Sequence, residues 1–195
     1  MKRWGALRAT RLDEKELSTD LGRGNFLFVG SSCDMFAASI PRAWTQRTLE
    51  HCASFPNKYL FQSKNPLGMA SFRENLRRLG AIVCTTIETN RVYPDFMGNT
   101  PSPRDRAEGM AWLQGLPRFV TIEPVVDFDL EEFTELLKRC EPAQVNIGAD
   151  SGHNGLPEPS KTKILDLIDR LSTFTVIDQK RNLSRVLQVP VSTTK

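Results

Sequence analysis

The sequence predicts an α/β protein built as an incomplete parallel (β/α) barrel of about six strands, with helices on the outside. Six short apolar runs, each followed by polar or ionisable residues, are separated by helical patterns. The runs cover residues 26–30, 59–61, 81–84, 119–122, 145–148 and 174–177. This alternation favours right-handed βαβ units and one parallel sheet. Because parallel strands end at the same edge, the polar residues after them are expected on one rim, where such folds carry their sites.

Five helices are predicted between the strands. They begin at Pro41, Pro66, Ser102, Asp129 and Ser160. Proline suits a first helical turn because its missing N–H would have no partner there. The second helical pattern continues without a break to Gly80. Asp129, followed three residues later by Glu132, resembles a capping box.

Two long loops and three segments complete the predicted organisation. Residues 91–103 follow the third strand and residues 151–159 follow the fifth; ordered loops of this length are often functional lids. The 195 residues suit one domain. We expect an N-terminal segment over residues 1–24, the partial barrel over residues 25–187 and a flexible tail over residues 188–195.

The composition is typical of a globular protein and says little about partners. Apolar residues make up 39% of the chain and charged residues 25%, with a net charge of +3. No apolar run approaches the length of a membrane span, so the cytoplasm is the expected location and no membrane partner is expected. The basic clusters around Arg77 and Arg106 are interpreted as solvated helix faces, and the charge does not support a nucleic-acid partner.

The four cysteines form no local metal or redox motif. They are Cys33, Cys52, Cys84 and Cys140, and no C-x-x-C pair is present. Cys52 and Cys140 fall on helical patterns and are interpreted as packing residues. Cys33 follows the first strand, where a thiol can be reactive. No metal-ligand set is assigned.

Side-chain alternation places two carboxylates on the inner face of the predicted barrel. Cys84, Thr86 and Glu88 share one face of the third strand, and Thr121 and Glu123 share one face of the fourth. The residues expected under the helices are Val120, Ile122, Val145 and Ile147. A filled barrel has branched apolar side chains inside, so an inner face this polar predicts a ligand cavity.

Glu88 and Glu123 allow several interpretations. Such a pair can serve as general acid and base, ligate a divalent metal, or hold the hydroxyl and ammonium groups of a ligand. A structural ion-pair network is the alternative. Two inward carboxylates require cations or donors nearby, because burying an unpaired charge is costly. The candidate cations are Lys64, Arg91, Arg118 and Lys180.

Four segments carry a resemblance to a known family. They are residues 28–36 (FVGSSCDMF), 85–91 (TTIETNR), 118–124 (RFVTIEP) and 146–150 (NIGAD). In this order they resemble a radical-SAM-like family of phage, prophage and bacterial proteins, which is distantly similar to the spore photoproduct lyase group. The resemblance extends from Lys2 to Leu187.

This resemblance implies two cofactors, and it shows that one cofactor-binding loop of the family is missing from this sequence. Family members bind S-adenosylmethionine and a [4Fe–4S] cluster, which is held by a C-x3-C-x2-C loop after the first strand of the barrel. This chain lacks that loop, so the cluster ligands are absent. The resemblance therefore implies a truncated barrel without the family's first strand. Such a protein keeps the S-adenosylmethionine and substrate cradle but is inactive alone, or is a truncated form of an active enzyme.

The resemblance and the rim argument together assign the site residues. The cofactor-binding residues are Gly30, Ser31, Ser32, Thr86, Glu88 and Glu123. The substrate-pocket residues are Asp34, Gln62, Lys64, Asn90, Arg91, Asn146, Asp150, His153, Asp178 and Lys180. No catalytic residue is assigned. His153 is interpreted either as a proton donor in a rim loop or as a solvated side chain.

Two other functions stay open as alternatives. One is a non-catalytic nucleotide-, nucleic-acid- or protein-binding module, and the other is a metal-dependent α/β-barrel hydrolase or lyase that uses Glu88 and Glu123. Without a preceding strand, residues 26–29 present an exposed sheet edge. We expect this edge to pair with a second copy or a partner chain, or to be covered by residues 1–24.

Overall fold

A computed structural model describes residues 10–152 and 154–188 of the chain. Within this part, six parallel strands form one sheet in chain order, with β1 and β6 at its edges. The strands are β1 (Phe26–Val29), β2 (Lys58–Gln62), β3 (Ile82–Thr86), β4 (Arg118–Ile122), β5 (Gln144–Ile147) and β6 (Val176–Gln179). The predicted fold class, an incomplete parallel (β/α) barrel, is confirmed. Residues 1–9 and 189–195, which belong to the two predicted end segments, lie outside the described residues.

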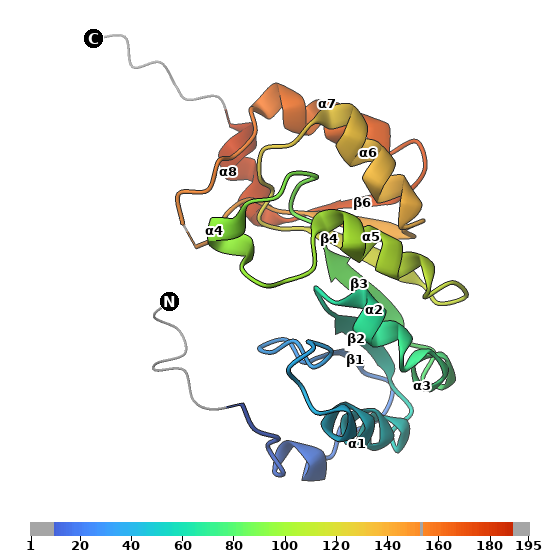
Figure 1. Ribbon diagram of the computed structural model, residues 1–195. Coiled ribbons are helices and arrows are strands. Elements are labelled where there is room, and N and C mark those ends of the chain that lie inside the picture. Colours follow the sequence, from blue (N-terminus) through green and yellow to red (C-terminus); the bar gives the residue numbers. More distant parts are fainter. Residues whose placement is uncertain (1–9, 153, 189–195) are drawn as a thin grey trace.

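The described helices are α1 (Arg42–Ala53), α2 (Pro66–Ala70), α3 (Arg73–Arg78), α4 (Pro94–Met97), α5 (Pro103–Ala111), α6 (Leu130–Arg139), α7 (Lys161–Leu171) and α8 (Ser184–Leu187), with short 3-10 turns η1 (Glu16–Ser18) and η2 (Arg181–Leu183). Helices α1 to α7 lie between successive strands in the chain, and α8 follows β6. All but α4 and α8 form a row along one side of the sheet (Figure 1). Helix α5 packs on α2 and α6, and α6 packs on α7. Within the described ranges, none of these helices has the length and apolar character needed to cross a membrane.

The core lies between the sheet and this row of helices. The strand residues of that face are nearly fully buried: Tyr59, Phe61, Val83, Val120, Ile122, Val145 and Ile147. They form one apolar cluster with helix residues such as Leu76, Met110 and Phe133. The predicted placement of the β4 and β5 apolar residues under the helices is therefore confirmed. The opposite side of the sheet is called the inner face below.

The predicted helix starts at Pro66, Ser102 and Ser160 are confirmed, and one predicted cap is wrong. The Ser102 and Ser160 hydroxyls each accept a hydrogen bond from a backbone N–H three residues later, at 3.1 and 3.3 Å. Asp129 precedes α6 but makes no side-chain cap with it. Its carboxylate accepts hydrogen bonds from Arg91 instead, at 2.9 Å from Nε and 2.5 Å from Nη2. A charged guanidinium is a stronger partner than a backbone N–H.

The pattern after Pro66 forms two helices rather than the single helix predicted. Phe72 separates α2 from α3 with non-helical dihedral angles (φ −116°, ψ 18°). Its ring is buried and packs edge-on against Phe36, with the ring centroids 6.0 Å apart. Tertiary packing of one aromatic side chain therefore interrupts a continuous helical pattern. The predicted long loop after β3 also contains a short helix, α4.

The described part of the N-terminal segment is held against α1 and the chain before β2. Arg47 of α1 donates to both carboxylate oxygens of Glu14, at 2.8 and 2.6 Å. The Asn57 amide donates to the carbonyl oxygens of Leu21 and Gly22, at 3.1 and 3.2 Å. These contacts fix the direction in which the chain enters β1.

Candidate functional site

The inner face changes from apolar to polar along the strands. Its residues at the amino ends of the strands are mostly apolar, namely Phe26, Phe28, Leu60, Ile82, Phe119 and Val176, with Lys58 and Gln144 as the polar exceptions. Toward the carboxyl ends they are Gln62, Thr86, Thr121, Asn146 and Asp178, and Glu88, Glu123 and Lys180 follow the strands. Phe26 and Phe28 are 57% and 44% exposed. The predicted alternation is confirmed. This face is open to solvent at the edge strands β1 and β6, whereas Cys84, Thr86 and Thr121 in its middle are buried.

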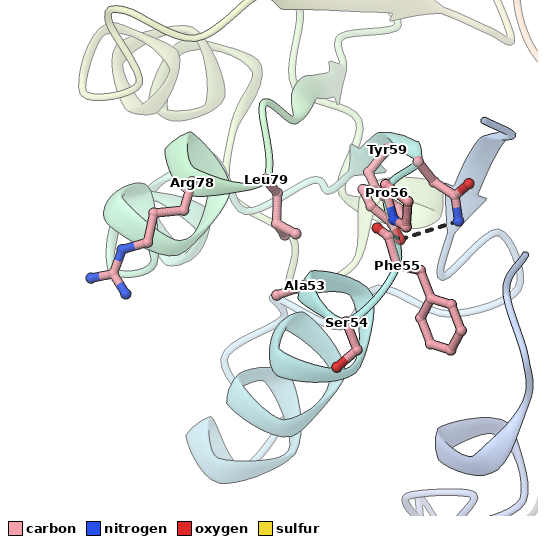
Figure 2. Close-up of a pocket in the computed structure, with 8 residues that line it drawn as sticks. Ala53, Ser54, Phe55, Pro56, Tyr59, Arg78 and Leu79 are labelled. Carbon is pink, nitrogen blue, oxygen red and sulfur yellow. Dashed lines mark hydrogen bonds between the residues drawn. The ribbon is translucent and has the colours of Figure 1, made fainter. Parts of the chain in front are cut away.

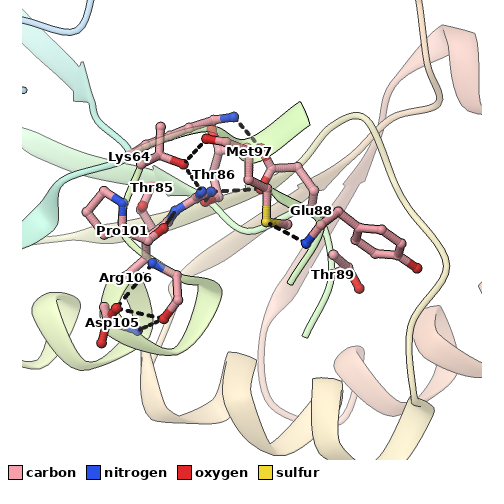
Figure 3. A network of polar contacts seen from close by, with 12 residues as sticks. Lys64, Thr85, Thr86, Glu88, Thr89, Met97, Pro101, Asp105 and Arg106 are labelled. Carbon is pink, nitrogen blue, oxygen red and sulfur yellow. Dashed lines mark hydrogen bonds and ion pairs between the residues drawn. The ribbon is translucent and has the colours of Figure 1, made fainter. Parts of the chain in front are cut away.

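Glu88, just after β3, is sealed inside the protein with 2% of its side chain exposed. Arg106 of α5 donates from Nη1 to Glu88 Oε2 at 2.7 Å, and the Lys64 ammonium pairs with Oε1. Burial raises the pKa of the Glu88 carboxyl, but the two cations outweigh burial and hold that pKa below its usual value. Figure 3 shows Arg106 reaching from α5 to the end of β3, where Glu88 and Thr86 lie. Glu88 is thus a charged carboxylate with both oxygens occupied.

Arg106 was predicted on a solvated helix face, and this prediction is wrong. The side chain is fully buried. Besides Glu88, it donates to the carbonyl oxygens of Thr86 and Pro101, at 2.9 and 2.7 Å, and to the Thr100 hydroxyl at 2.8 Å. The sequence did carry a signal, because Arg106 shares helical spacing with the buried stripe of α5, which ends at Met110.

Glu123, just after β4, is the more open of the two carboxylates, with 24% of its side chain exposed. Its Oε2 pairs with the Lys180 ammonium after β6, and its Oε1 accepts a hydrogen bond from Asn182 Nδ2 at 2.8 Å. Gly148, after β5, lies directly beside it: a Cβ there would be 2.7 Å from Glu123 Oε1. The ends of β4, β5 and β6 together build this part of the rim.

The polar side chains of the inner face form short hydrogen-bond chains across the sheet. Gln62 Nε2 donates to the Thr86 hydroxyl at 2.9 Å, and Asn146 Nδ2 donates to the Thr121 hydroxyl at 3.4 Å. Asp178 is exposed beside Asn146 in the register of β5 and β6. These amides, hydroxyls and one carboxylate can donate to and accept from a bound polar ligand.

The turn after β1 divides into an exposed part and a structural part. Gly30 has φ 75°, a conformation that favours glycine, and Ser31 and Ser32 are exposed. The Asp34 carboxylate accepts a hydrogen bond from the Ser63 hydroxyl at 2.7 Å and another from the Lys64 backbone N–H at 2.9 Å. Ser31 and Ser32 are therefore accessible to a ligand, whereas Asp34 joins the ends of β1 and β2.

Asn90 and Arg91 belong to a separate ionic cluster. The Arg91 guanidinium pairs with Asp127 and Asp129, both at 2.5 Å, and Asn90 Nδ2 donates to Asp129 at 3.3 Å. Hydrogen bonds from Arg91 and then from Asn90 lower the pKa of Asp129 to about 2. This cluster joins the loop after β3 to the start of α6. Arg91 is thus not a partner of Glu88 or Glu123, and neither is Arg118, which pairs with Glu141.

Asp150 closes the loop after β5. Its carboxylate accepts hydrogen bonds from the Gly152 backbone at 3.0 Å and from Asn154 Nδ2 at 2.8 Å. The predicted site residue His153 lies outside the described residues.

A surface pocket of about 310 Å³ lies at the opposite end of the sheet from the rim (Figure 2). Its lining residues are Ala53, Ser54, Phe55, Pro56, Asn57, Tyr59, Arg78 and Leu79. The hydroxyl of Tyr59 donates to the Cys52 carbonyl oxygen at 2.8 Å, so this polar group of the pocket is already used. None of the predicted site residues lines this pocket.

The cysteines do not fit an iron–sulfur cluster. Cys52, Cys84 and Cys140 are buried in three different places, namely in α1, in β3 and just after α6, whereas a cluster requires neighbouring thiolates. Burial raises the pKa of the Cys52 and Cys84 thiols to about 11 and of the Cys140 thiol to about 12. Cys33 is exposed after β1. Among residues 10–152 and 154–188, no three His, Cys, Asp or Glu side chains are arranged to hold a metal ion. The residues described here therefore do not fit the cluster.

Comparison with protein-family models and with curated proteins finds no match for this chain. A function therefore has to be argued from the rim itself.

Two residues of the rim, Arg106 and Asn182, were not among the predicted site residues. Arg106 comes from a helix of the outer row and Asn182 from the turn η2 after β6. Asn182 lies two positions after Lys180, so its place near the end of β6 could have been read from the sequence. Its contact with Glu123 could not, because that contact spans two strands.

Proposed function

We propose that this chain is a radical-SAM-like partial barrel that binds S-adenosylmethionine at the carboxyl-end rim of its inner face and does not cleave it alone. The observation that carries the proposal is the open rim around Glu123, where a partly exposed carboxylate, a lysine and inner-face amides converge. The family resemblance supports the choice of ligand, since its four segments end on this rim.

The chemistry of the rim suits such a ligand. S-adenosylmethionine carries an ammonium, a carboxylate, a sulfonium and two ribose hydroxyls. Glu123 and Asp178 are acceptors for the positively charged groups and hydroxyls, and Lys180 and Asn146 are donors. Ser31 and Ser32 supply further exposed hydroxyls after β1. The sulfonium is the group that supplies radical chemistry in cluster-bearing enzymes, and no such step is assigned to these residues because they do not fit a cluster.

The structure changes the roles that we propose for several predicted residues. Glu88 is sealed by Lys64 and Arg106, so we assign it to holding the end of β3 rather than to a ligand hydroxyl. Asp34, Asn90, Arg91 and Asp150 likewise serve local structure. Thr86 is also buried, and its hydroxyl accepts a hydrogen bond from Gln62. The ligand-contacting residues in this proposal are Ser31, Ser32, Gln62, Glu123, Asn146, Asp178 and Lys180.

Titration calorimetry with S-adenosylmethionine tests the proposal. We expect micromolar binding that Glu123→Gln weakens by about tenfold or more, because a charge-assisted contact becomes neutral. Glu135→Gln, the same change on the exposed side of α6, is the matched control and should bind like the wild type. Absence of binding heat at several temperatures would sink the proposal.

The exposed aromatic residues favour a second candidate, a non-catalytic binding module. Sheets of parallel strands are normally covered on both faces, yet Phe26 and Phe28 of β1 are largely exposed. The β1 edge contains no charge and no proline, the usual protections against pairing. We propose that a second copy of the chain pairs with this edge, in the cytoplasm as the expected location. The metal-dependent alternative is not favoured, because Glu88 and Glu123 are each neutralised by cations of the chain itself.

A further inference from the structure

Asn182 makes two hydrogen bonds that fix its orientation at the rim. Its Nδ2 group donates to Glu123 Oε1 at 2.8 Å and to the Ala149 carbonyl oxygen at 2.9 Å. Both acceptors lie at strand ends, Glu123 after β4 and Ala149 after β5. Within the asparagine amide only the nitrogen carries hydrogens, and both of them are used here, so the side-chain oxygen faces the other way. That oxygen is buried and has no hydrogen-bond partner within the described part of the chain.

Gly148 makes this arrangement possible. A Cβ at residue 148 would lie 2.7 Å from Glu123 Oε1 and 3.0 Å from Asn182 Oδ1. The first distance is shorter than a carbon–oxygen contact allows and the second is tight, so a side chain there would push the carboxylate away and crowd the amide. The glycine, the glutamate and the asparagine therefore form one packed unit, with Lys180 on the second carboxylate oxygen.

The same unit joins the C-terminal segment to the sheet. Lys180 and Asn182 belong to residues 180–187, which contain η2 and α8. Leu183 is buried in the core, and the Lys180 backbone N–H donates to the Ile147 carbonyl oxygen at 2.8 Å. Arg185 pairs with Glu158 in the loop before α7. Glu123 thus receives both of its side-chain partners from this one segment.

We propose that Asn182 is a positioning residue: it fixes the Glu123 carboxylate for the ligand and links ligand binding to the order of residues 180–187. The ligand half of this inference rests on the proposed function, namely that S-adenosylmethionine binds at Glu123. Asn182 acts through Glu123 and does not contact the ligand, because its amide hydrogens are used and its oxygen is covered by Gly148. A ligand that holds Glu123 in place therefore also holds the segment that supplies Asn182 and Lys180.

Hydrogen exchange tests the structural half without any ligand. In Asn182→Ala, we expect protection of the Lys180 and Leu183 backbone amides to fall about tenfold or more, because two hydrogen bonds to the segment are lost. Arg181→Ala, the exposed neighbour on the same turn, is the matched control and should keep wild-type protection. Unchanged protection in Asn182→Ala would overturn the link between Asn182 and the segment.

Calorimetry with S-adenosylmethionine tests the ligand half through a double-variant cycle. Asn182→Asp keeps the side-chain shape but places a second carboxylate against Glu123, and we expect about tenfold weaker binding. In the double variant Glu123→Gln/Asn182→Asp the loss should not exceed that of Glu123→Gln alone, because both changes act through one carboxylate. Additive losses would show that Asn182 contacts the ligand itself, and would overturn the positioning role.

Failure of the proposed function and failure of the role inferred for Asn182 give different results. If the wild type does not bind S-adenosylmethionine, the proposed function and the ligand half of this inference both fail, and the exchange experiment still decides whether Asn182 holds residues 180–187. If the wild type binds and Asn182→Asp binds equally well, the proposed function stands and the inference is wrong. If the wild type binds and the ligand also raises protection of the Lys180 amide, both are supported.

Discussion

The two halves of the sheet hold an inward carboxylate in opposite ways. In the first half, β1 to β3, Glu88 is 2% exposed and faces two cations, Lys64 and the fully buried Arg106. In the second half, β4 to β6, Glu123 is 24% exposed and has one cation, Lys180, and one neutral donor, Asn182. Two chemically identical residues on neighbouring strand ends therefore have different surroundings.

This difference separates a structural charge from a ligand-binding one. The sealed Glu88 carboxylate compensates the charge of the buried Arg106 guanidinium. If Glu88 bound a ligand instead, Arg106 would be left as a buried charge without its anion, which is costly. A partly exposed carboxylate can accept a further hydrogen bond at little desolvation cost. Burial and the number of cations, not residue type or position on the rim, decide which glutamate is available.

The edges of the sheet differ in the same sense. The β1 edge carries only apolar residues, and its two phenylalanines are exposed on the inner face. The β6 edge carries the exposed polar residues Asp178 and Gln179 near the rim and the exposed Val176 at its amino end. The first half therefore has a sealed rim and an apolar edge, and the second half has an open rim and a mixed edge that is polar near the rim.

Removing each carboxylate gives the strongest test of this comparison. Glu88→Ala leaves Arg106 buried without its anion, and we expect a loss of about 3–5 kcal/mol in unfolding free energy. Glu123→Ala leaves a lysine that can turn to solvent, and we expect a loss of about 1 kcal/mol. Urea unfolding of the two variants measures both. Equal losses would mean that the two carboxylates have the same role.

Gly148→Ala tests whether the second half depends on close packing at Glu123. The new methyl group overlaps Glu123 Oε1, and we expect a loss of about 1–3 kcal/mol together with weaker S-adenosylmethionine binding. The added change Glu123→Ala removes the overlapping oxygen, so it should restore part of the stability but not the binding. If Glu123→Ala lowers stability further in this background, the overlap is not the cause.

Acid should weaken the first half through Glu88. Because its folded-state pKa is lower than the unfolded value of 4.5, the ion pairs contribute fully above that value, and their contribution is lost as pH falls through the folded pKa. Urea midpoints of the wild type and Glu88→Gln, measured from neutral pH downward, should therefore differ most above 4.5 and converge below it. A difference that stays constant with pH would contradict the charged state of Glu88.

The smallest effect on stability is expected at the β1 edge. Phe28→Lys changes an exposed side chain, so the unfolding free energy should stay within about 0.5 kcal/mol of the wild type. Its effect should appear in analytical ultracentrifugation, where the wild type self-associates and Phe28→Lys is monomeric. Val176→Lys on the β6 edge is the control and should associate like the wild type. A monomeric wild type at high concentration would remove the proposed edge pairing.

The local pattern of the sequence was sufficient for much of the fold. Strand alternation correctly assigned Val120 and Ile122 to the helix side and Glu123 to the inner face. The predicted partners Lys64 and Lys180 were found on Glu88 and Glu123 respectively. These predictions succeeded because the two-residue period of a strand and the common direction of parallel strands are local properties.

Other features depended on contacts that no local pattern contains. Phe72 interrupts a helical pattern because its ring packs against Phe36, which lies 36 residues earlier in the sequence. Asp129 gives up a helix cap because Arg91 offers it a charged partner. In both cases a tertiary interaction outweighs a local preference of about 1 kcal/mol.

The sequence by itself determined the strand order, the two faces of the sheet and the gathering of ionisable residues on one rim, because these follow from periodicity and chain direction. Only the tertiary structure decided which of those residues are available to a ligand. Availability depends on burial and on the number of partners, and both are set by side chains from distant elements: Arg106 from α5 seals Glu88, and Asn182 from η2 holds Glu123 at the surface of the rim.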